Sequence, residues 1–505
     1  MSRALVVTFA VVAFVLCSLL PVGYLLVQSL TAGSGHASAV WLDARQRGLL
    51  WNTGVLGVST AMLATALGAP LGIALARVTL PLKGLLRLAL AMPVLLPPYI
   101  VALAWTYLIR SERAYSLSGA IVVLSLVFYP LSMLATEVAL RRIDGRLEEA
   151  GLVHAPSLLV LRRISLPLAA PSILAAALII FVLSVSEFGV PGLLRVRVYT
   201  TEVFTAFAAL YDFGRAVMLA VPLLLMSLVA GSVAIALMGD PLVSSRRGVG
   251  TGPAYLEGWE RRAVAMAIAV ITIAVGIPVM VLVNEALGVD SIAAAVSGSG
   301  PAIENSVRLS AVGATGVVGI ALWLGYARAR AHRRIGQFAD ILMVVAFAVP
   351  STIVGVGLIG LWNRAGVFGS LYGTEAMLII GYLARFIPVA VLMIAATMRY
   401  VPVSHEEAAA VSGAGWFRTM SHVVIPQARL GLLMAWVIAF VLAFGELGVS
   451  ILVSPAGETT LPIRIYTIIA NTAPAHVATL ALLQTTVILC PVAMLGIAVW
   501  IRDAR

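Results

Sequence analysis

The stretch SHEEAAAVSGAGWFRTMSHVVIP, residues 404–426, is a short polar segment between two strongly apolar stretches of the chain. Ser404 and Glu407 have the spacing of a capping box, and Gly413 can end a helix in the left-handed conformation that glycine adopts readily. Trp416 begins a second apolar face after this turn. The residues therefore predict a polar helix, a turn and a second helix. By itself, such a segment is also compatible with a connector that has no special role.

A second copy of this segment lies earlier in the chain. EEAGLVHAPSLLVLRRISLP occupies residues 148–167 and aligns without a gap with residues 407–426, at an offset of 259 (407 minus 148). The same register continues into the next apolar stretch, where Glu187 aligns with Glu446. Two copies in one register indicate a duplicated unit and argue against a connector without a role.

The composition places the chain in a membrane. Of its 505 residues, 61% are hydrophobic and 11% are charged, which is too apolar for a soluble domain. Runs of about 20 apolar residues match the thickness of a bilayer. We therefore expect an all-α, polytopic membrane protein with about 12 transmembrane helices. The expected spans are residues 4–28, 53–76, 86–109, 117–139, 169–190, 214–238, 262–283, 305–328, 338–360, 375–398, 430–452 and 477–500.

These spans divide into two tandem six-helix units. Residues 239–260 are rich in Gly, Pro, Ser and charge, as expected of a surface linker, so the units are predicted at residues 1–238 and 261–505. Because each unit has an even number of helices, both enter the membrane from the same side, and an axis along the membrane normal relates them. This arrangement predicts a solute pathway between the halves.

The distribution of basic residues predicts the orientation. The net charge of +11 would suggest a nucleic-acid partner for a soluble protein, but cytoplasmic loops of membrane proteins are also basic, so we expect no nucleic acid. Placing both termini, both polar segments and the linker in the cytoplasm puts 22 of the 33 Lys and Arg residues on that side. We therefore expect a multi-pass inner-membrane protein with cytoplasmic N- and C-termini.

Residues 406–426 resemble the EAA loop of ABC importer permeases, whose pattern is E-A-A-x(3)-G-x(9)-I-x-L-P. Glu407, Ala408, Ala409, Gly413 and Pro426 fit this pattern. In that family, the loop supplies a coupling helix that docks into a cleft of a cytoplasmic ATPase. The whole chain resembles the fused permeases of the iron(III), thiamine and sulfate branch, in which one polypeptide carries two six-helix units.

The first copy, residues 148–167, departs from the pattern. Glu148, Ala150 and Pro167 fit, whereas Glu149 replaces the middle alanine and His154 replaces the glycine. A residue other than glycine is unfavourable in a left-handed turn. Either the turn differs in the first copy, or that copy docks less tightly.

The resemblance implies that the energy comes from partner proteins. It implies two ATPase subunits on the cytoplasmic side, one at each loop, and an extracytoplasmic binding protein that delivers the solute. ATP would be bound by the partners, and this chain would need no cofactor. Its single lysine, Lys83, is followed by Gly84 and Leu85, so the chain has no G-x(4)-G-K-[ST] phosphate loop. The histidines lack metal-ligand spacing, so we expect no membrane enzyme and assign no metal site.

Three charged residues in the expected spans are candidates for the solute pathway, because charge is costly in a membrane. Glu187 and Glu446 each lie 20 residues after the closing proline of their loop (187 minus 167, 446 minus 426), about 30 Å of helix, which predicts a position toward the external end. They line the outer pore there, or they are solvated at the interface and cap helices near Gly189 and Gly448. Arg385 has no basic counterpart in the first half, and it either pairs with an acid such as Glu446 or faces an aqueous cavity.

Prolines interrupt several expected spans. Pro93, Pro97 and Pro98 fall in one span, Pro350 in another and Pro388 in a third. Because proline removes a backbone hydrogen bond, it allows a helix to bend or break. Pro97 and Pro350 are therefore candidates for a gate.

The predicted function is that of a permease subunit of an ABC importer that carries a small solute. Ferric iron is the first candidate, because two carboxylates near the mouth suit a cation, and because SEFGVPGLL and GELGVSILV resemble ferric-iron fused permeases. Thiamine, phosphonates and polyamines remain alternatives. A proton-coupled secondary carrier is the alternative from another class, since such carriers also contain two parallel six-helix repeats.

Overall fold

The structure is a computed structural model that describes residues 3–31, 43–238, 254–287, 292–364, 366 and 369–503. The described residues form helices and turns without a strand, which confirms the all-α prediction. Most of the expected linker, residues 239–253, lies outside them. The α-helices are α1 (Arg3–Phe14), α2 (Leu20–Thr31), α4 (Ala44–Arg77), α5 (Lys83–Ala91), α6 (Pro98–Ile109), α7 (Leu117–Arg141), α8 (Gly145–His154), α9 (Ser157–Val160), α10 (Leu166–Ser186), α11 (Gly189–Leu193), α12 (Tyr199–Phe204), α13 (Phe213–Met238), α14 (Glu260–Ile271), α15 (Ile277–Ala286), α16 (Ile292–Ser297), α17 (Gly300–Ala329), α18 (Arg333–Ala348), α19 (Ser351–Trp362), α20 (Glu375–Arg399), α21 (Val403–Val411), α22 (Trp416–Thr419), α23 (Ile425–Phe444), α24 (Ser450–Val453), α25 (Leu461–Ile468) and α26 (Pro474–Asp503).

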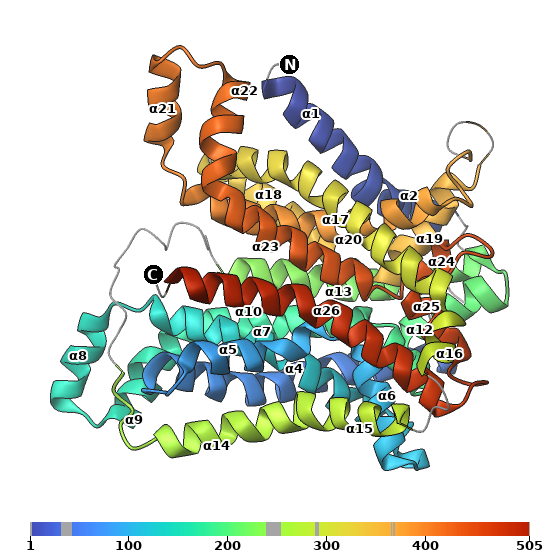
Figure 1. Cartoon of the computed structure of the whole chain (residues 1–505), viewed down its shortest axis with the longest axis horizontal. Helices are drawn as coiled ribbons and strands as arrows, with labels where there is room; N and C mark the ends of the chain where they lie inside the picture. Colours follow the sequence, from blue (N-terminus) through green and yellow to red (C-terminus); the bar gives the residue numbers. More distant parts are fainter. Residues whose placement is uncertain are drawn as a thin grey trace.

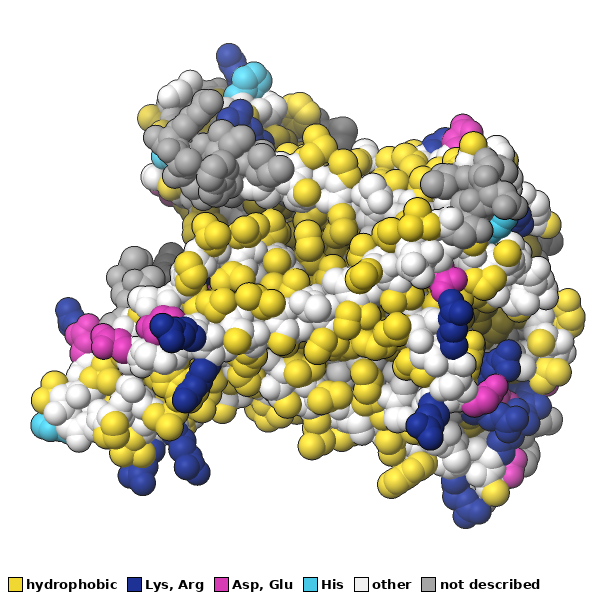
Figure 2. All heavy atoms as spheres, turned by 60° about the horizontal axis from the view of Figure 1, so that its bottom comes forward, with side chains coloured by type: hydrophobic (Ala, Val, Ile, Leu, Met, Phe, Trp, Pro, Cys, Tyr) yellow, Lys and Arg dark blue, Asp and Glu magenta, His cyan; other side chains and the backbone are white. Residues whose placement is uncertain are grey.

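The helices form a membrane-spanning bundle. In the described part of the chain, 10 helical segments are long and apolar enough to cross a bilayer, and two bent helix pairs bring the number to as many as 12. Figure 2 shows a broad apolar belt between two ends at which the charged side chains gather. This is the surface expected of a polytopic membrane protein.

The two bent pairs lie at the predicted prolines. The chain turns by 89° between the α5 segment and α6, and by 91° between α18 and α19. Leu96 and Val349 have extended ψ values of 134° and 124°, because the residue before a proline is excluded from the helical region. Bending at Pro97 and Pro350 is therefore confirmed. The break expected at Pro388 is absent, because that proline lies inside the continuous helix α20.

The spans that carry Glu187 and Glu446 begin and end earlier than predicted. They run over Ser157–Ser186 and Trp416–Phe444, instead of residues 169–190 and 430–452. The apolar face restarts at Trp416, as expected, but it leads directly into the membrane helix. The two glutamates therefore follow the ends of their helices and do not lie inside them.

A π-helical segment lies near the start of each of these spans. The segments η4 (Leu161–Ser165) and η8 (Met420–Val424) lead into α10 and α23, whose second residues are Pro167 and Pro426. A proline has no N–H group, and its ring clashes with the preceding α-helical turn, so a wider turn accommodates it. The closing proline of each polar loop thus shapes the entry into the next span.

The first helix of each half packs on the other half. Ala10 and Phe14 of α1 belong to the core that α17 and α20 form, and Ala267 of α14 belongs to the core of the first half. Helix α2 approaches α19 closely at Gly357, where a Cβ atom would lie 2.7 Å from the carbonyl oxygen of Pro21. Figure 1 shows α1 beside the second half and α14 beside the first. The halves are therefore interlocked.

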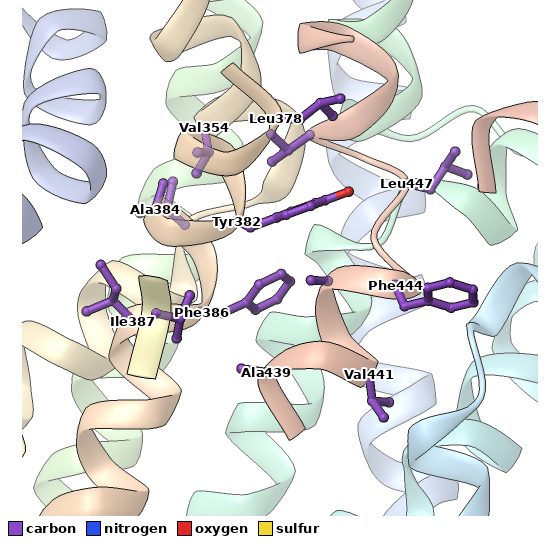
Figure 3. Packing of buried hydrophobic residues seen from close by; sticks show 14 of the residues in the cluster. Val354, Leu378, Tyr382, Ala384, Phe386, Ile387, Ala439, Val441, Phe444 and Leu447 are labelled. Carbon is purple, nitrogen blue, oxygen red and sulfur yellow. The ribbon is translucent and has the colours of Figure 1, made fainter. Parts of the chain in front are cut away.

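The second half has an aromatic core next to the boundary between the halves. Figure 3 shows Tyr382 and Phe386 projecting from α20 on the same side, toward the chain that follows α23. Their ring centroids lie 6.4 Å apart, and both side chains are buried. This packing holds the loop that follows Phe444 against α20.

Both polar helices project from one end of the bundle. Figure 1 shows α8 and α21 at the end where both chain termini lie, whereas α6, α12 and α16 lie at the opposite end. Both halves therefore enter the membrane from the same side, as the even number of spans in each half requires.

Candidate functional site

A cavity of about 160 Å³ lies between the two halves, and we call it the central cavity. The bent chains at Pro97 and Ser351 and the ends of α10 and α23 meet there, so that both halves contribute to its wall. The lining residues include Pro97, Tyr99, Phe128 and Glu187 from the first half, and Ser351, Arg385, Phe386 and Glu446 from the second. Bends in two spans and the ends of two others therefore create this site.

The two glutamates have equivalent roles at the central cavity. Glu187 accepts hydrogen bonds from the N–H groups of Gly189 at 3.1 Å and Val190 at 2.7 Å. Glu446 accepts one from the N–H group of Val449 at 3.0 Å. Each carboxylate thereby caps the short helix after its span, which satisfies N–H groups that a helix start leaves free. The helix-capping interpretation of these residues is confirmed.

Both glutamates and Arg385 line the central cavity. Arg385 lies 10 residues into the 25-residue helix α20 (385 minus 375), and its Nε atom is 3.8 Å from Oε2 of Glu446. Glu446 therefore lies beside a residue inside the span α20, and Glu187 lines the same cavity. Their position toward the external end stays a prediction.

Arg385 approaches Glu446, as one sequence-based alternative predicted. Its Nη1 atom also donates to the carbonyl oxygen of Val349 at 2.8 Å, and its guanidinium lies 6.0 Å from the centre of the Phe347 ring. Val349 is the residue at which the α18–α19 chain bends before Pro350. Arg385 therefore connects the bend of one span with the glutamate that follows another.

Sequence reasoning missed a polar contact between the halves. The hydroxyl of Tyr99 in α6 donates to Oε1 of Gln484 in α26, whose Nε2 donates to the carbonyl oxygen of Phe444 at 3.2 Å. All three residues are buried. A glutamine within an apolar span was the available signal for this contact.

The polar helices α8 and α21 are each tied to a long span by an ion pair. The Nε atom of Arg77 at the end of α4 donates to Oε1 of Glu148 at 2.9 Å, and that of Arg330 donates to Oε1 of Glu406 at 2.8 Å. The equivalent acids are thus Glu148 and Glu406, 258 residues apart. The ungapped alignment of Glu148 with Glu407 is wrong, and the counterpart of Glu407 is Glu149.

The extra residue of the second copy lies in the turn after the polar helix. Helices α8 and α21 begin 258 residues apart (403 minus 145), whereas α9 and α22 begin 259 apart (416 minus 157). Gly413 has φ +81°, and the N–H groups of Gly413 and Ala414 bond to Ala410 and Ala409, which is a Schellman ending. In the first copy, Ala155 is extended at φ −148°. The turn therefore differs between the copies.

The start of α21 also differs from the prediction. The helix begins at Val403 after Pro402, and no side chain caps it, so the expected capping box of Ser404 and Glu407 is absent. Proline already has a φ angle compatible with a helix start and has no N–H group to satisfy. Glu407 stays exposed.

The outer faces of α8 and α21 are exposed and partly apolar. Glu149, Ala150 and His154 are exposed on α8, and Glu407 and Ala408 on α21, whereas Ala409 is half-buried. Val153 is 76% exposed and Val411 is 90% exposed, and both belong to helices that project from one end of the bundle (Figure 1). Exposed apolar residues on a projecting helix are typical of a surface that binds another protein.

No permanent metal centre is evident in the described residues, in which no group of three or more His, Cys, Asp or Glu side chains could hold a metal ion. The central cavity brings together Glu187, Glu446 and Arg385, with Pro97 in its wall and Pro350 at the adjoining bend. The polar loops lie apart from it, at one end of the bundle. The molecule therefore has a candidate passage and two separate candidate docking helices.

Comparison with known proteins agrees with this arrangement. Residues 317–501 match the family of binding-protein-dependent transport system inner membrane components. This match, together with similarity along most of the chain, identifies the protein as an inner-membrane permease component of an ABC importer. Proteins of this class work with an ATPase and a solute-binding protein, and they are transport proteins, not enzymes.

Relatives of the chain have different solutes in their names. The Fe(3+)-transport system permease protein FbpB 2 of Haemophilus influenzae is 24% identical over 456 residues, which cover 88% of this chain and 89% of the relative. The ferric transport system permease protein FbpB of Actinobacillus pleuropneumoniae is 24% identical over 70% of this chain and 56% of the relative. The molybdenum transport system permease protein ModB of Escherichia coli is 30% identical over 28% of this chain and 69% of the relative.

Proposed function

We propose that this chain carries ferric iron across the inner membrane, and that two separate ATPase subunits drive it through α8 and α21. The observation that carries the proposal is the pair of equivalent carboxylates, Glu187 and Glu446, at one cavity between the halves. A binding protein would deliver the iron to the end of the bundle opposite these helices. The relatives named for ferric transport support the same solute.

The chemistry of the central cavity suits a hard cation in transit. Oxygen atoms of carboxylates are the ligands that hard cations prefer. With Glu187, Glu446 and Arg385 ionised, the cavity carries a net charge of −1 (two negative, one positive), which favours a cation. Two carboxylates that already accept backbone hydrogen bonds form an incomplete ligand set. A solute held weakly in this way can leave again, as transport requires.

The proposed coupling uses the contacts at the bases of α8 and α21. Each helix projects from the bundle, and an Arg–Glu pair ties it to a span, α4 or α17. A force on either helix is therefore transmitted to the spans around the cavity. The excess of basic residues at this end supports a cytoplasmic location for the helices and both termini. The family match favours this mechanism over that of a proton-coupled secondary carrier.

A second candidate solute is an oxyanion such as molybdate. The observation in its favour is Arg385, whose buried Nε atom has no hydrogen-bond partner. A guanidinium with a free donor is well suited to bind an oxyanion. The relative named for molybdenum transport supports this alternative, although its match covers 28% of the chain.

Uptake into proteoliposomes that contain the chain, its ATPase and its binding protein tests the proposal. We expect ATP-dependent uptake of iron(III) citrate, and uptake at least about tenfold slower in Glu187→Gln and Glu446→Gln. Each substitution removes a unit charge near the cation, which at an effective dielectric constant of about 20 is worth more than 1.4 kcal/mol. Glu285→Gln is the matched control, because this partly buried glutamate pairs with Arg110 away from the cavity.

The outcomes separate the candidates. Iron uptake that is unchanged in both cavity variants would contradict the role of the carboxylates. Uptake of molybdate but not iron, with loss of uptake in Arg385→Gln, would establish the second candidate. Uptake that needs a proton gradient and no ATPase would refute the importer mechanism itself.

A further inference from the structure

The ion pair at the base of α8 is enclosed more completely than its counterpart at α21. Arg77 and Glu148 have side chains that are 0% exposed, whereas those of Arg330 and Glu406 are 12% and 15% exposed. The Oγ atom of Ser165 in η4 also donates to Oε1 of Glu148, at 2.6 Å. An additional part of the chain must therefore cover this pair.

The covering segment is the described end of the linker, which joins the two halves. Tyr255 donates from its hydroxyl to Oε1 of Glu148 at 3.3 Å and lies 2.8 Å from Oγ of Ser165. The guanidinium of Arg77 lies 5.8 Å from the centre of the Tyr255 ring, and the N–H group of Leu256 donates to the carbonyl oxygen of Arg77 at 3.2 Å. Burial raises the pKa of Tyr255 above its ordinary value, so the hydroxyl stays protonated and can donate.

The second half contains the same three groups, but its tyrosine comes from a different place. Tyr326 lies one turn before Arg330 in α17 and donates from its hydroxyl to Oε2 of Glu406 at 2.7 Å. The guanidinium of Arg330 lies 5.9 Å from the centre of the Tyr326 ring. At the position of α4 that corresponds to Tyr326, one turn before Arg77, the first half has Ile73.

The two halves thus contain the same arrangement of Arg, Glu and Tyr, but the tyrosine comes from a different segment in each half. In each, the tyrosine hydroxyl satisfies the glutamate, and the ring packs on the arginine. A buried carboxylate without such donors is costly. The second half obtains the tyrosine within the helix that carries the arginine, whereas the first half obtains it from the linker. The linker therefore supplies a group that the first half lacks.

We propose that Tyr255 is a positioning residue for α8. The linker consequently joins the two halves and also holds the first coupling helix in place. Without its hydroxyl, α8 would lose one of the contacts that fix it to α4 and η4. Motion of the ATPase would then be transmitted less completely to the first half. The coupling part of this inference rests on the proposed function, whereas the positioning part does not.

Hydrogen exchange of the purified full-length chain in lipid nanodiscs tests the positioning. We expect Tyr255→Phe to accelerate exchange in residues 145–154 about tenfold, because a hydrogen bond to a charged group is lost while the ring is retained. Exchange in residues 403–411 should stay unchanged. Tyr326→Phe is the matched variant. It should accelerate exchange at residues 403–411 and leave exchange at residues 145–154 unchanged.

A transplanted tyrosine provides the rescue. Ile73→Tyr places the hydroxyl where the second half has it, so the double variant Ile73→Tyr/Tyr255→Phe should restore slow exchange at α8. Rescue would show that the tyrosine hydroxyl holds α8 in place, and that packing of the Tyr255 ring is not sufficient. If Tyr255→Phe leaves exchange at α8 unchanged, or accelerates it at α8 and α21 equally, the positioning role is refuted.

The ratio of ATP hydrolysed to solute transported tests the coupling in the same proteoliposomes. We expect Tyr255→Phe to raise this ratio about threefold or more, and Ile73→Tyr to bring it back. An unchanged ratio would overturn the coupling part, even if exchange at α8 were faster. If the wild-type chain transports nothing with an ATPase, the proposed function fails, and the exchange experiment still decides the role of Tyr255.

Discussion

Arg385 is the charge that makes the two halves unequal at the central cavity. The corresponding residue of the first half, 258 positions earlier, is Val127. Sequence reasoning anticipated the contact with Glu446 because a charge in mid-span requires a partner. The structure adds the hydrogen bond to the carbonyl oxygen of Val349, which no pattern in the sequence indicates.

A double-mutant cycle tests the energetic role of this pair. We expect Arg385→Met to lower the free energy of unfolding by about 3–5 kcal/mol, because it leaves a buried carboxylate without its counter-charge. Arg385→Met/Glu446→Gln should cost less than the sum of the two single changes by about 1 kcal/mol or more. Unfolding by SDS in mixed micelles provides the measurement.

Arg308→Met is the matched control for this cycle. Arg308 pairs with Glu375, but the two side chains are 47% and 29% exposed, so we expect a cost of about 1 kcal/mol or less. If the costs at Arg385 and Glu446 were simply additive, the two residues would not interact energetically.

At the scale of elements, the two polar helices differ most in how they end. Helix α8 ends before the extended residue Ala155, whereas α21 ends in a left-handed turn at Gly413. The second ending is one residue longer, and this residue shifts the alignment from 258 to 259. Similar sequences can therefore have different local geometry. The first copy lacks the glycine because its helix ends in a turn that does not require a left-handed residue.

The turn after α21 gives a prediction about docking. Gly413→Ala forces an L-residue into a left-handed conformation, which costs about 1–2 kcal/mol. We expect the affinity for the ATPase to fall about fivefold or more. Gly415→Ala is the matched control, because Gly415 has φ −66° and neither glycine has an atom within 4 Å of an added Cβ. Titration of the ATPase against the permease measures both, and equal affinities would contradict a role for this turn.

The broken spans show which helical features can be predicted. Proline in the sequence indicated the bends at Pro97 and Pro350, because it excludes the preceding residue from the helical region. The same reasoning failed for Pro388, which lies inside α20. Tertiary packing decides between a bend and a continuous helix, since neighbouring helices can support the turn that a proline weakens.

At the scale of the whole molecule, the first helix of each half packs on the other half. Because α1 packs on the second half and α14 on the first, neither set of six spans buries its own apolar surface by itself. The boundaries predicted at residues 1–238 and 261–505 describe the repeat in the sequence. They do not separate the packing units.

This exchange predicts the behaviour of a divided chain. If residues 1–246 and 247–505 are expressed as two polypeptides in the same cell, we expect a tag on one fragment to co-purify the other in about equal amounts. Either fragment expressed alone should aggregate or be degraded. In each fragment, the first helix, α1 or α14, would lack the surface of the other half on which it packs. A single fragment that purifies as a monodisperse, stable monomer would contradict the interlocked packing.

By itself, the sequence determined that this protein is a helical membrane protein with an internal repeat, because composition and register are properties of the chain alone. It also indicated the two projecting polar helices and the bends at two prolines, which follow from local backbone chemistry. Only the tertiary structure decided the meeting of Glu187 and Glu446 at one cavity, the equivalence of Glu148 and Glu406, and the place of Tyr255 beside α8. These depend on where spans begin, on the length of one turn and on contacts between distant residues, none of which leaves a periodic signal in the chain.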